Sequence, residues 1–169
     1  MTFSERVMRA DIWLLDKVFQ PVADRLPEKL PATECGLSCL FGALMLSAAS
    51  IVAVIFLAGM EFSDAVFNVL IWALGLSFYI GIYRMKALVR PGHMNPLRHM
   101  LGGMRLISVP FAAYALWQGM SAPAPFLVPF WFNTLANIVF VIGIYLVSCE
   151  IRPPPERYKA PVSAQTEIG

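Results

Sequence analysis

Long stretches without charge alternate with short charged segments along this chain. Three stretches contain no Asp, Glu, Lys or Arg, and they cover residues 35–60, 65–83 and 106–149. A helix needs about 20 apolar residues to cross the roughly 30 Å hydrocarbon core of a bilayer. The first two stretches are long enough for one crossing each, and the third is long enough for two.

The third stretch contains its own turn signal, Ser121-Ala122-Pro123-Ala124-Pro125. Proline lacks a backbone donor and restricts the residue before it, so this sequence favours a tight connection between two helices. Because backbone groups in lipid must be hydrogen-bonded within their own segment, the crossings should be helical. The pattern therefore predicts four transmembrane helices, near residues 36–59, 63–83, 101–120 and 126–149.

The third of these helices is the shortest. Its uncharged part, residues 106–120, reaches full length only if Arg105 extends its guanidinium to the interface. Pro110 lies inside it and is expected to kink it. A re-entrant loop is the alternative, and it would leave three crossings with the termini on opposite sides of the membrane.

Basic residues near the ends of the spans predict orientation. They occur before the first span, between the second and third, and after the fourth, whereas the two short connections carry none. With four crossings, all 13 Lys and Arg fall on one side, and we expect that side to be the cytoplasm. No segment resembles a secretory signal peptide and no Asn-x-Ser/Thr sequon occurs, which fits a bacterial inner membrane.

A different pattern precedes the membrane segment. Six apolar residues recur at spacings of four and three, which places them on one stripe of a helix that opens at Ser4. We expect this amphipathic helix to lie in the membrane interface, with packing against the protein's own cytoplasmic loop or against a partner as alternatives. Pro21 should kink or end it. The stripe consists of Met8, Ile12, Leu15, Phe19, Val22 and Leu26.

These patterns divide the chain into three parts. Residues 1–34 form a cytoplasmic amphipathic helix and linker, residues 35–150 a membrane domain, and residues 151–169 a disordered cytoplasmic tail that is proline-rich at its start. The expected fold class is all-α, a polytopic membrane protein with a four-helix transmembrane bundle behind an N-terminal amphipathic helix.

Composition supports this fold class. The chain is 58% hydrophobic and 14% charged, whereas soluble domains are about 25% charged. A disordered chain is excluded, because it needs low hydrophobicity and high net charge. A soluble enzyme domain is disfavoured, because so short a chain has too little polar surface to cover this much apolar mass.

The connection between the second and third spans is strongly basic and has no acidic residue. It could bind an anionic lipid headgroup, a phosphate compound or an acidic partner, or its charges could serve only to fix topology. Without an aromatic residue it offers no stacking platform, so no nucleic-acid partner is expected. Its basic residues are Arg84, Lys86, Arg90, Arg98 and Arg105.

Cysteine and histidine are expected on this same side of the membrane, and both residue types ligate transition metals. However, Cys-x3-Cys is not a zinc-knuckle spacing, and cysteine at helix ends is commonly a small hydrophobic residue. We therefore expect no metal and no other cofactor. The residues concerned are Cys35, Cys39, Cys149, His93 and His99.

Three asparagines, Asn68, Asn133 and Asn137, lie inside the predicted spans. Such amides hydrogen-bond across helices, and they could also line a substrate path. Small-residue pairs, including Ala43 with Ser47 and Ser77 with Gly81, favour close helix approach. No ionisable residue lies deep in a span, so the sequence indicates neither a proton relay nor a coupling-ion site.

These observations predict a non-enzymatic inner-membrane protein that binds a membrane protein partner, or itself, as an accessory or assembly subunit of a larger membrane system. The alternative is a small homo-oligomeric pore or transporter, which includes holin-like lesions, lined by the three asparagines. A lipid-modifying membrane enzyme that uses the two histidines and the basic connection is a third hypothesis.

Overall fold

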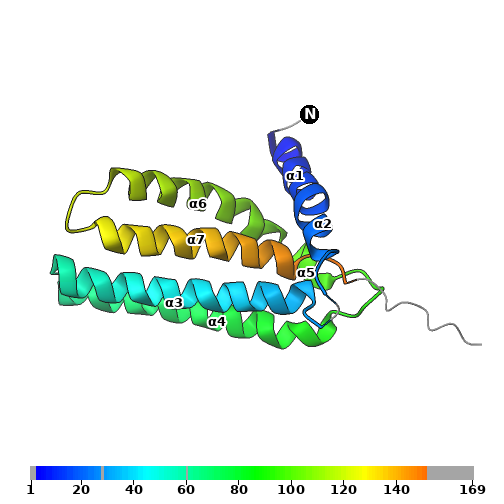
Figure 1. Ribbon diagram of the computed structural model, residues 1–169, viewed down its shortest axis with the longest axis horizontal. Helices are drawn as coiled ribbons and strands as arrows, with labels where there is room; N and C mark the ends of the chain where they lie inside the picture. The colour runs from blue at the N-terminus through cyan, green and yellow to red at the C-terminus, as the bar shows by residue number, and fades with distance from the viewer. Residues whose placement is uncertain (1–2, 28, 60, 152–169) are drawn as a thin grey trace, which may run out of the picture.

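The computed structural model describes residues 3–27, 29–59 and 61–151, and the regular structure within them is entirely helical (Figure 1). The predicted tail, residues 152–169, lies outside the described residues. In chain order the elements are α1 (Phe3–Leu14), a π-helical turn η1 (Leu15–Phe19), α2 (Gln20–Ala23), α3 (Ala32–Ala58), α4 (Phe62–Met85), a 3₁₀ turn η2 (Lys86–Leu88), α5 (Pro96–Met100), α6 (Gly102–Ser121) and α7 (Leu127–Val147).

Four long helices run side by side, and their two short connections, α3 to α4 and α6 to α7, lie at one end (Figure 1). The other end carries α1, α2 and α5, and we call it the terminal end. α3 packs most extensively against α7, while α4 packs against α3 and α6 against α7. Among the described residues these contacts join the helices in the order α4, α3, α7, α6, so the predicted four-helix bundle is not confirmed.

Three of the four helices are long and apolar enough to cross a membrane, namely α3, α4 together with η2, and α7. The structure thus supports the prediction that this chain is a membrane protein. α6 matches the predicted third span in position, but it is not among these three. Arg105, Gln118 and several glycine and serine residues dilute its apolar character. Within the described residues, the fourth crossing is therefore not confirmed.

α3 and α7 approach closely because each has a glycine where they cross. A Cβ on Gly36 would lie 2.6 Å from Cγ2 of Val147 and 2.8 Å from the carbonyl oxygen of Gly143. A Cβ on Gly143 would lie 2.9 Å from the carbonyl oxygen of Gly36. A larger residue does not fit at either position, as in other close helix crossings in membranes. This pair was not among the small-residue pairs expected from the sequence, since its two members come from distant helices.

Side-chain hydrogen bonds connect the other two neighbouring pairs, α4 with α3 and α6 with α7. Nε1 of Trp72 on α4 donates a hydrogen bond to the carbonyl oxygen of Leu44 on α3, at 2.9 Å. Oγ1 of Thr134 on α7 donates to the carbonyl oxygen of Ala115 on α6, at 2.8 Å. Thr134 also occupies the space beside Gly119, where an added Cβ would lie 2.7 Å from its hydroxyl. These bonds reach backbone carbonyls that already belong to a helix, so they join helices without disrupting them.

The N-terminal helical segment continues past Pro21 and ends at Ala23. A π-helical turn comes directly before the proline, and in it the N–H of Gln20 donates to the carbonyl oxygen of Leu15. A proline ring collides with the carbonyl four residues earlier in a regular helix. The wider π turn relieves this collision, so the segment is interrupted at the expected place but is not ended there.

The structure divides the predicted apolar stripe between the core and the surface, and Val22, after the π turn, is 48% exposed. Leu15 is fully buried, and Phe19 and Leu26 pack against the core. Met8 and Ile12, by contrast, are about half exposed. The segment packs against its own chain, with α1 on α6 and η1 on α7. The stripe therefore does not form one surface.

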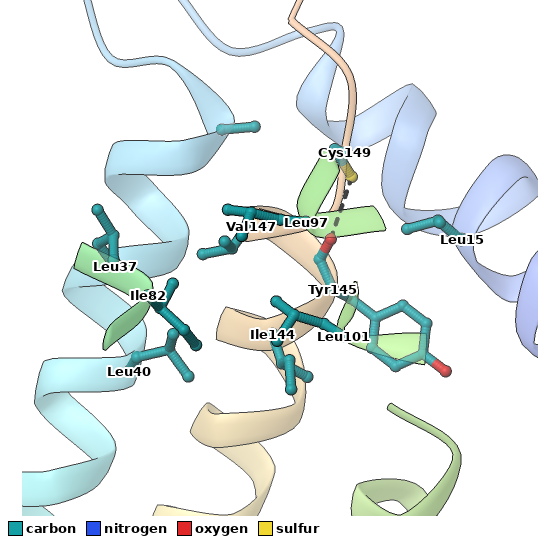
Figure 2. Close-up of a cluster of buried hydrophobic side chains, with 11 residues drawn as sticks. Leu15, Leu37, Leu40, Ile82, Leu97, Leu101, Ile144, Tyr145, Val147 and Cys149 are labelled. Carbon is teal, nitrogen blue, oxygen red and sulfur yellow. Dashed lines mark hydrogen bonds between the residues drawn. The ribbon is translucent and has the colours of Figure 1, made fainter. Parts of the chain in front are cut away.

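The buried apolar core lies at the terminal end, where all of these elements meet (Figure 2). At the opposite end, Phe56 and Phe62 are more than four fifths exposed, which a surrounding bilayer would accommodate. The labelled core residues come from η1, α3, α4, α5, α7 and their flanks, and they are Leu15, Leu37, Leu40, Ile82, Leu97, Leu101, Ile144, Tyr145, Val147 and Cys149.

Candidate functional site

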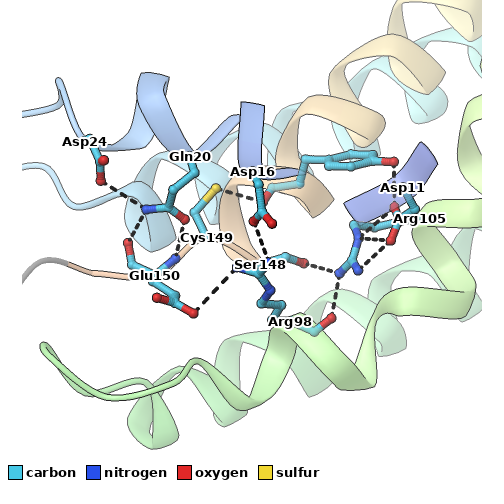
Figure 3. Close-up of polar contacts among 10 residues, drawn as sticks. Asp11, Asp16, Gln20, Asp24, Arg98, Arg105, Ser148, Cys149 and Glu150 are labelled. Atoms are coloured by element: carbon cyan, nitrogen blue, oxygen red, sulfur yellow. Dashed lines mark hydrogen bonds and ion pairs between the residues drawn. The ribbon is translucent and has the colours of Figure 1, made fainter. Parts of the chain in front are cut away.

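A buried ion pair holds α1 against α6 at the terminal end (Figure 3). The side chains of Asp11 and Arg105 are only 6% and 4% exposed. Nη2 of Arg105 donates to the Asp11 carboxylate at 2.8 Å, and Nε donates to the same carboxylate at 3.1 and 3.3 Å. This side-on, two-point geometry is the strong form of the arginine–carboxylate pair. Arg105 was expected to extend to the membrane interface, and the structure instead buries it against Asp11.

Further hydrogen bonds support this buried pair. Nη1 of Arg105 donates to the carbonyl oxygen of Arg98 at 2.8 Å and to Oγ of Ser148 at 3.0 Å. The Tyr145 hydroxyl donates to Asp11 at 2.8 Å. Buried charges require such additional partners, because desolvation otherwise outweighs their mutual attraction. The cluster thus joins α1, α6 and α7, and sequence reasoning missed it because nothing local marks Asp11 as the partner of Arg105.

A second layer of polar contacts surrounds the buried pair (Figure 3). Arg98 of α5 pairs with Asp16 of η1 and, at 3.5 Å, with Glu150 after α7. The Gln20 amide donates to the backbone carbonyl of Glu150 at 3.1 Å and accepts from its backbone N–H at 2.9 Å. The N-terminal segment is therefore bonded to both α5 and the end of α7.

Asn95 links α7 to the basic segment between the second and third predicted spans, residues 84–105, which we call the middle connection. Its side-chain oxygen accepts from the N–H of Leu97 and so caps α5. Its amide nitrogen donates to the carbonyl oxygens of Val147, at 2.7 Å, and Cys149, at 2.8 Å. Asparagine followed by proline is a recognisable helix start, and that signal was available in the sequence. The bonds to α7 were not, because they depend on tertiary packing.

Three of the five basic residues in the middle connection are paired with carboxylates of the same chain. Lys86 pairs with Glu34 at the start of α3. Arg84 and Arg90 are exposed, and neither forms an ion pair with another described residue. The other two paired residues are Arg98 and Arg105. Much of the positive charge available for an external anion is thus already neutralised.

The cysteines and histidines do not gather into a ligand set. No group of three or more His, Cys, Asp or Glu suited to a metal occurs among the described residues. His93 and His99 are exposed. Cys149 is fully buried, its thiol lies 3.4 Å from the carbonyl oxygen of Tyr145, and burial raises the pKa of this thiol to about 12.

A second candidate site lies between the membrane helices. It is a groove of about 500 Å³, bordered by α3, α4 and α7. The three asparagines singled out in the sequence, Asn68, Asn133 and Asn137, all line it. Nδ2 of Asn137 donates to the backbone carbonyl of Asn133 at 2.8 Å and to its side-chain oxygen at 3.3 Å. The structure thus brings together polar residues that the sequence places on two separate helices.

Comparison with known proteins adds no assignment to either site. No protein family model, no curated protein and no solved structure matches this chain.

Proposed function

We propose that this protein is a non-enzymatic membrane subunit that binds a membrane protein partner and serves in the assembly or operation of a larger membrane system. The observation that carries the proposal is the N-terminal segment, which is fixed in place and still displays apolar side chains. Its buried face is bonded to α6 and α7 through Asp11 and Gln20. Its outer face exposes Met8, Ile12, Trp13, Val18 and Val22, each 40–58% accessible.

A rigid apolar surface favours binding, because little conformational entropy is lost when a partner covers it. Aromatic and aliphatic anchors on such a surface supply most of the affinity in protein interfaces. The stripe residues that face the core, among them Leu15 and Phe19, are unavailable to a partner. The proposed surface therefore keeps the exposed stripe residues Met8, Ile12 and Val22 and adds two exposed neighbours, Trp13 and Val18.

The test is affinity purification in a mild detergent with Ile12 and Val22 replaced by Asp. Met94→Asp is the matched control, because Met94 is also an exposed apolar residue but lies between η2 and α5, outside the N-terminal segment. We expect I12D/V22D to lose a stoichiometric partner that the wild type and M94D retain. An unchanged set of co-purifying proteins in all three would contradict the proposal.

We further propose four crossings, a bacterial inner-membrane location and cytoplasmic termini. α6 has 20 residues, and at about 1.5 Å per residue it is roughly 30 Å long, which matches the hydrocarbon core. Its one charged residue, Arg105, is neutralised by Asp11, which lowers the cost of placing it near the bilayer. The acidic residues Glu61 and Asp64 lie in and after the α3–α4 connection, at the end without basic residues.

A homo-oligomeric pore is the second candidate, and the shared groove of Asn68, Asn133 and Asn137 favours it. If these amides line a conducting path, N133L/N137L should abolish flux from liposomes while leaving insertion intact. Retained flux in that variant would exclude the asparagine-lined path.

A further inference from the structure

The groove between α4 and α7 has the walls of a small-molecule site. Small residues of α3, among them Ala43, Ser47 and Ser50, line it. Aromatic rings line it as well, and Phe78 of α4 lies 6.1 Å from Phe140 of α7, measured between ring centroids. A volume of about 500 Å³ with mostly apolar and aromatic walls and a few polar groups is typical of ligand pockets. The aromatic lining residues are Trp72, Phe78, Tyr79, Phe126, Phe130 and Phe140.

Two polar atoms in the groove have unused hydrogen-bonding capacity. Nδ2 of Asn133 and Oδ1 of Asn137 have no hydrogen-bond partner among the described residues. They offer one donor and one acceptor on adjacent turns of α7. Asn133 and Asn137 lie about 9 and 15 Å along α7 from its start, at 1.5 Å per residue, which corresponds to hydrocarbon depth. Water is scarce there, so unpaired amide groups favour a ligand that can bond to them.

Charge restricts the ligand further. The residues that line the groove include no Asp, Glu, Lys, Arg or His. An ionic headgroup would therefore lack a counter-charge, and a plain hydrocarbon chain would leave the amides unpaired.

We propose that this groove binds a neutral, lipid-soluble ring compound with a carbonyl or hydroxyl group. Its polar group hydrogen-bonds to Asn133 and Asn137, and its ring packs between the aromatic side chains of α4 and α7. This site is separate from the partner-binding surface proposed above, which lies on α1, η1 and α2.

A transmembrane helix from a second copy fits the groove less well. Close helix packing in membranes uses small residues that let the two backbones approach. Here the small residues lie beside bulky rings on α4 and α7, including Trp72, Phe78 and Phe130, which would keep an incoming backbone away.

The experiment uses the purified full-length protein in a mild detergent, with decylubiquinone as the probe. Replacing Trp13, Trp117 and Trp131 with Phe leaves Trp72 in the groove as the fluorescent reporter. We expect decylubiquinone to quench the Trp72 fluorescence saturably. N133L/N137L should raise the dissociation constant about tenfold, which is the effect of losing one or two hydrogen bonds. Q118L is the matched control, because it replaces an exposed amide on α6 outside the groove and should bind like the parent. Decylbenzene, which has the ring and chain without a carbonyl, should not compete for the site.

A second variant, Ser47→Phe, fills the groove from α3 and should abolish saturable quenching without using the asparagines. Linear quenching of equal slope in all variants would show partitioning into detergent and would overturn the proposal. The native mass of the protein is measured in parallel, because it can give a second result that would contradict the proposal. A dimer that N133L/N137L dissociates would show that a second copy occupies the groove.

Discussion

At the scale of single residues, the pairing of Asp11 with Arg105 determines how the N-terminal segment is held. Two opposite charges that are both more than nine tenths buried gain little over a well-packed apolar pair. Losing one of them is costly, because the survivor stays buried without a counter-charge. The main effect of the cluster is therefore to fix the position of α1, and its net contribution to the free energy of unfolding is small.

Asp11→Ala and Arg105→Leu should each lower the free energy of unfolding by about 3–5 kcal/mol. The double variant D11A/R105L should lose less than the sum of the two, since it leaves no unpaired charge. Denaturant titration in detergent measures all three values. Arg84→Leu is the control, because this exposed arginine has no ion-pair partner among the described residues and should change stability by about 0.5 kcal/mol or less. Strict additivity of the two single variants would contradict a coupled pair.

Cys149 should react slowly with maleimide in the folded protein. Burial raises the pKa of its thiol from 9.0 to about 12, so the reactive thiolate is scarce near pH 7. The same shift predicts alkaline instability. Between these two pKa values the unfolded chain releases the proton and the folded chain keeps it, so stability falls as the pH rises from 9 towards 12.

A C35A/C39A background isolates this thiol. Labelling should rise steeply in denaturant and remain slow without it, and Cys149→Ala should reduce the stability loss above pH 9. Rapid labelling of the folded protein at pH 7 would show that the thiol is accessible.

At the scale of elements, the crossing of α3 and α7 organises the four long helices. Gly36 and Gly143 allow the two backbones to touch, and α4 and α6 then pack on the outer sides of this central pair. Because α4 has α3 as its main neighbour, the groove that contains the asparagines stays open between α4 and α7.

Gly36→Ala should be strongly destabilising, because its Cβ would meet backbone atoms of α7 at 2.7 and 2.8 Å that cannot move independently. Such overpacking costs about 1–3 kcal/mol, occasionally more. Gly81→Ala, on α4, is the matched control, since nothing lies within 4 Å of a Cβ at that position. Thermal unfolding in detergent compares the two. Equal melting temperatures would show that α3 and α7 do not cross at Gly36.

At the scale of the whole molecule, the ion pairs and the buried core lie at the terminal end (Figures 2 and 3), and the short connections lie at the other (Figure 1). This asymmetry gives the protein one end that is rigid and partly polar, while little of the three helices that could cross a membrane is buried within the described residues. A binding function fits this arrangement, because the rigid end can present a fixed surface outside the bilayer.

The proposed topology can be tested with single cysteines placed at Ser4 and Thr166 and in the α6–α7 connection at Ala122, in a background with the three natural cysteines replaced. Four crossings predict that a membrane-impermeant maleimide labels Ala122→Cys in intact cells and labels the two terminal positions only after lysis. Labelling of Thr166→Cys but not Ser4→Cys in intact cells would instead mean three crossings.

The sequence by itself determined the helices. Runs of uncharged residues set where α3, α4, α6 and α7 begin and end to within a few residues, because helix formation in lipid depends on the segment's own backbone bonds. The sequence likewise identified the three asparagines that line the groove.

Tertiary structure decided which residues meet. The partner of Arg105, the Gly36–Gly143 crossing and the gathering of asparagines from α4 and α7 all join residues far apart in the chain, and no local periodicity encodes them. The division of the N-terminal stripe has the same origin. Leu15, Phe19 and Leu26 contact the core, whereas the other three stripe residues stay about half exposed, and a helical period alone does not show which positions the rest of the chain will cover.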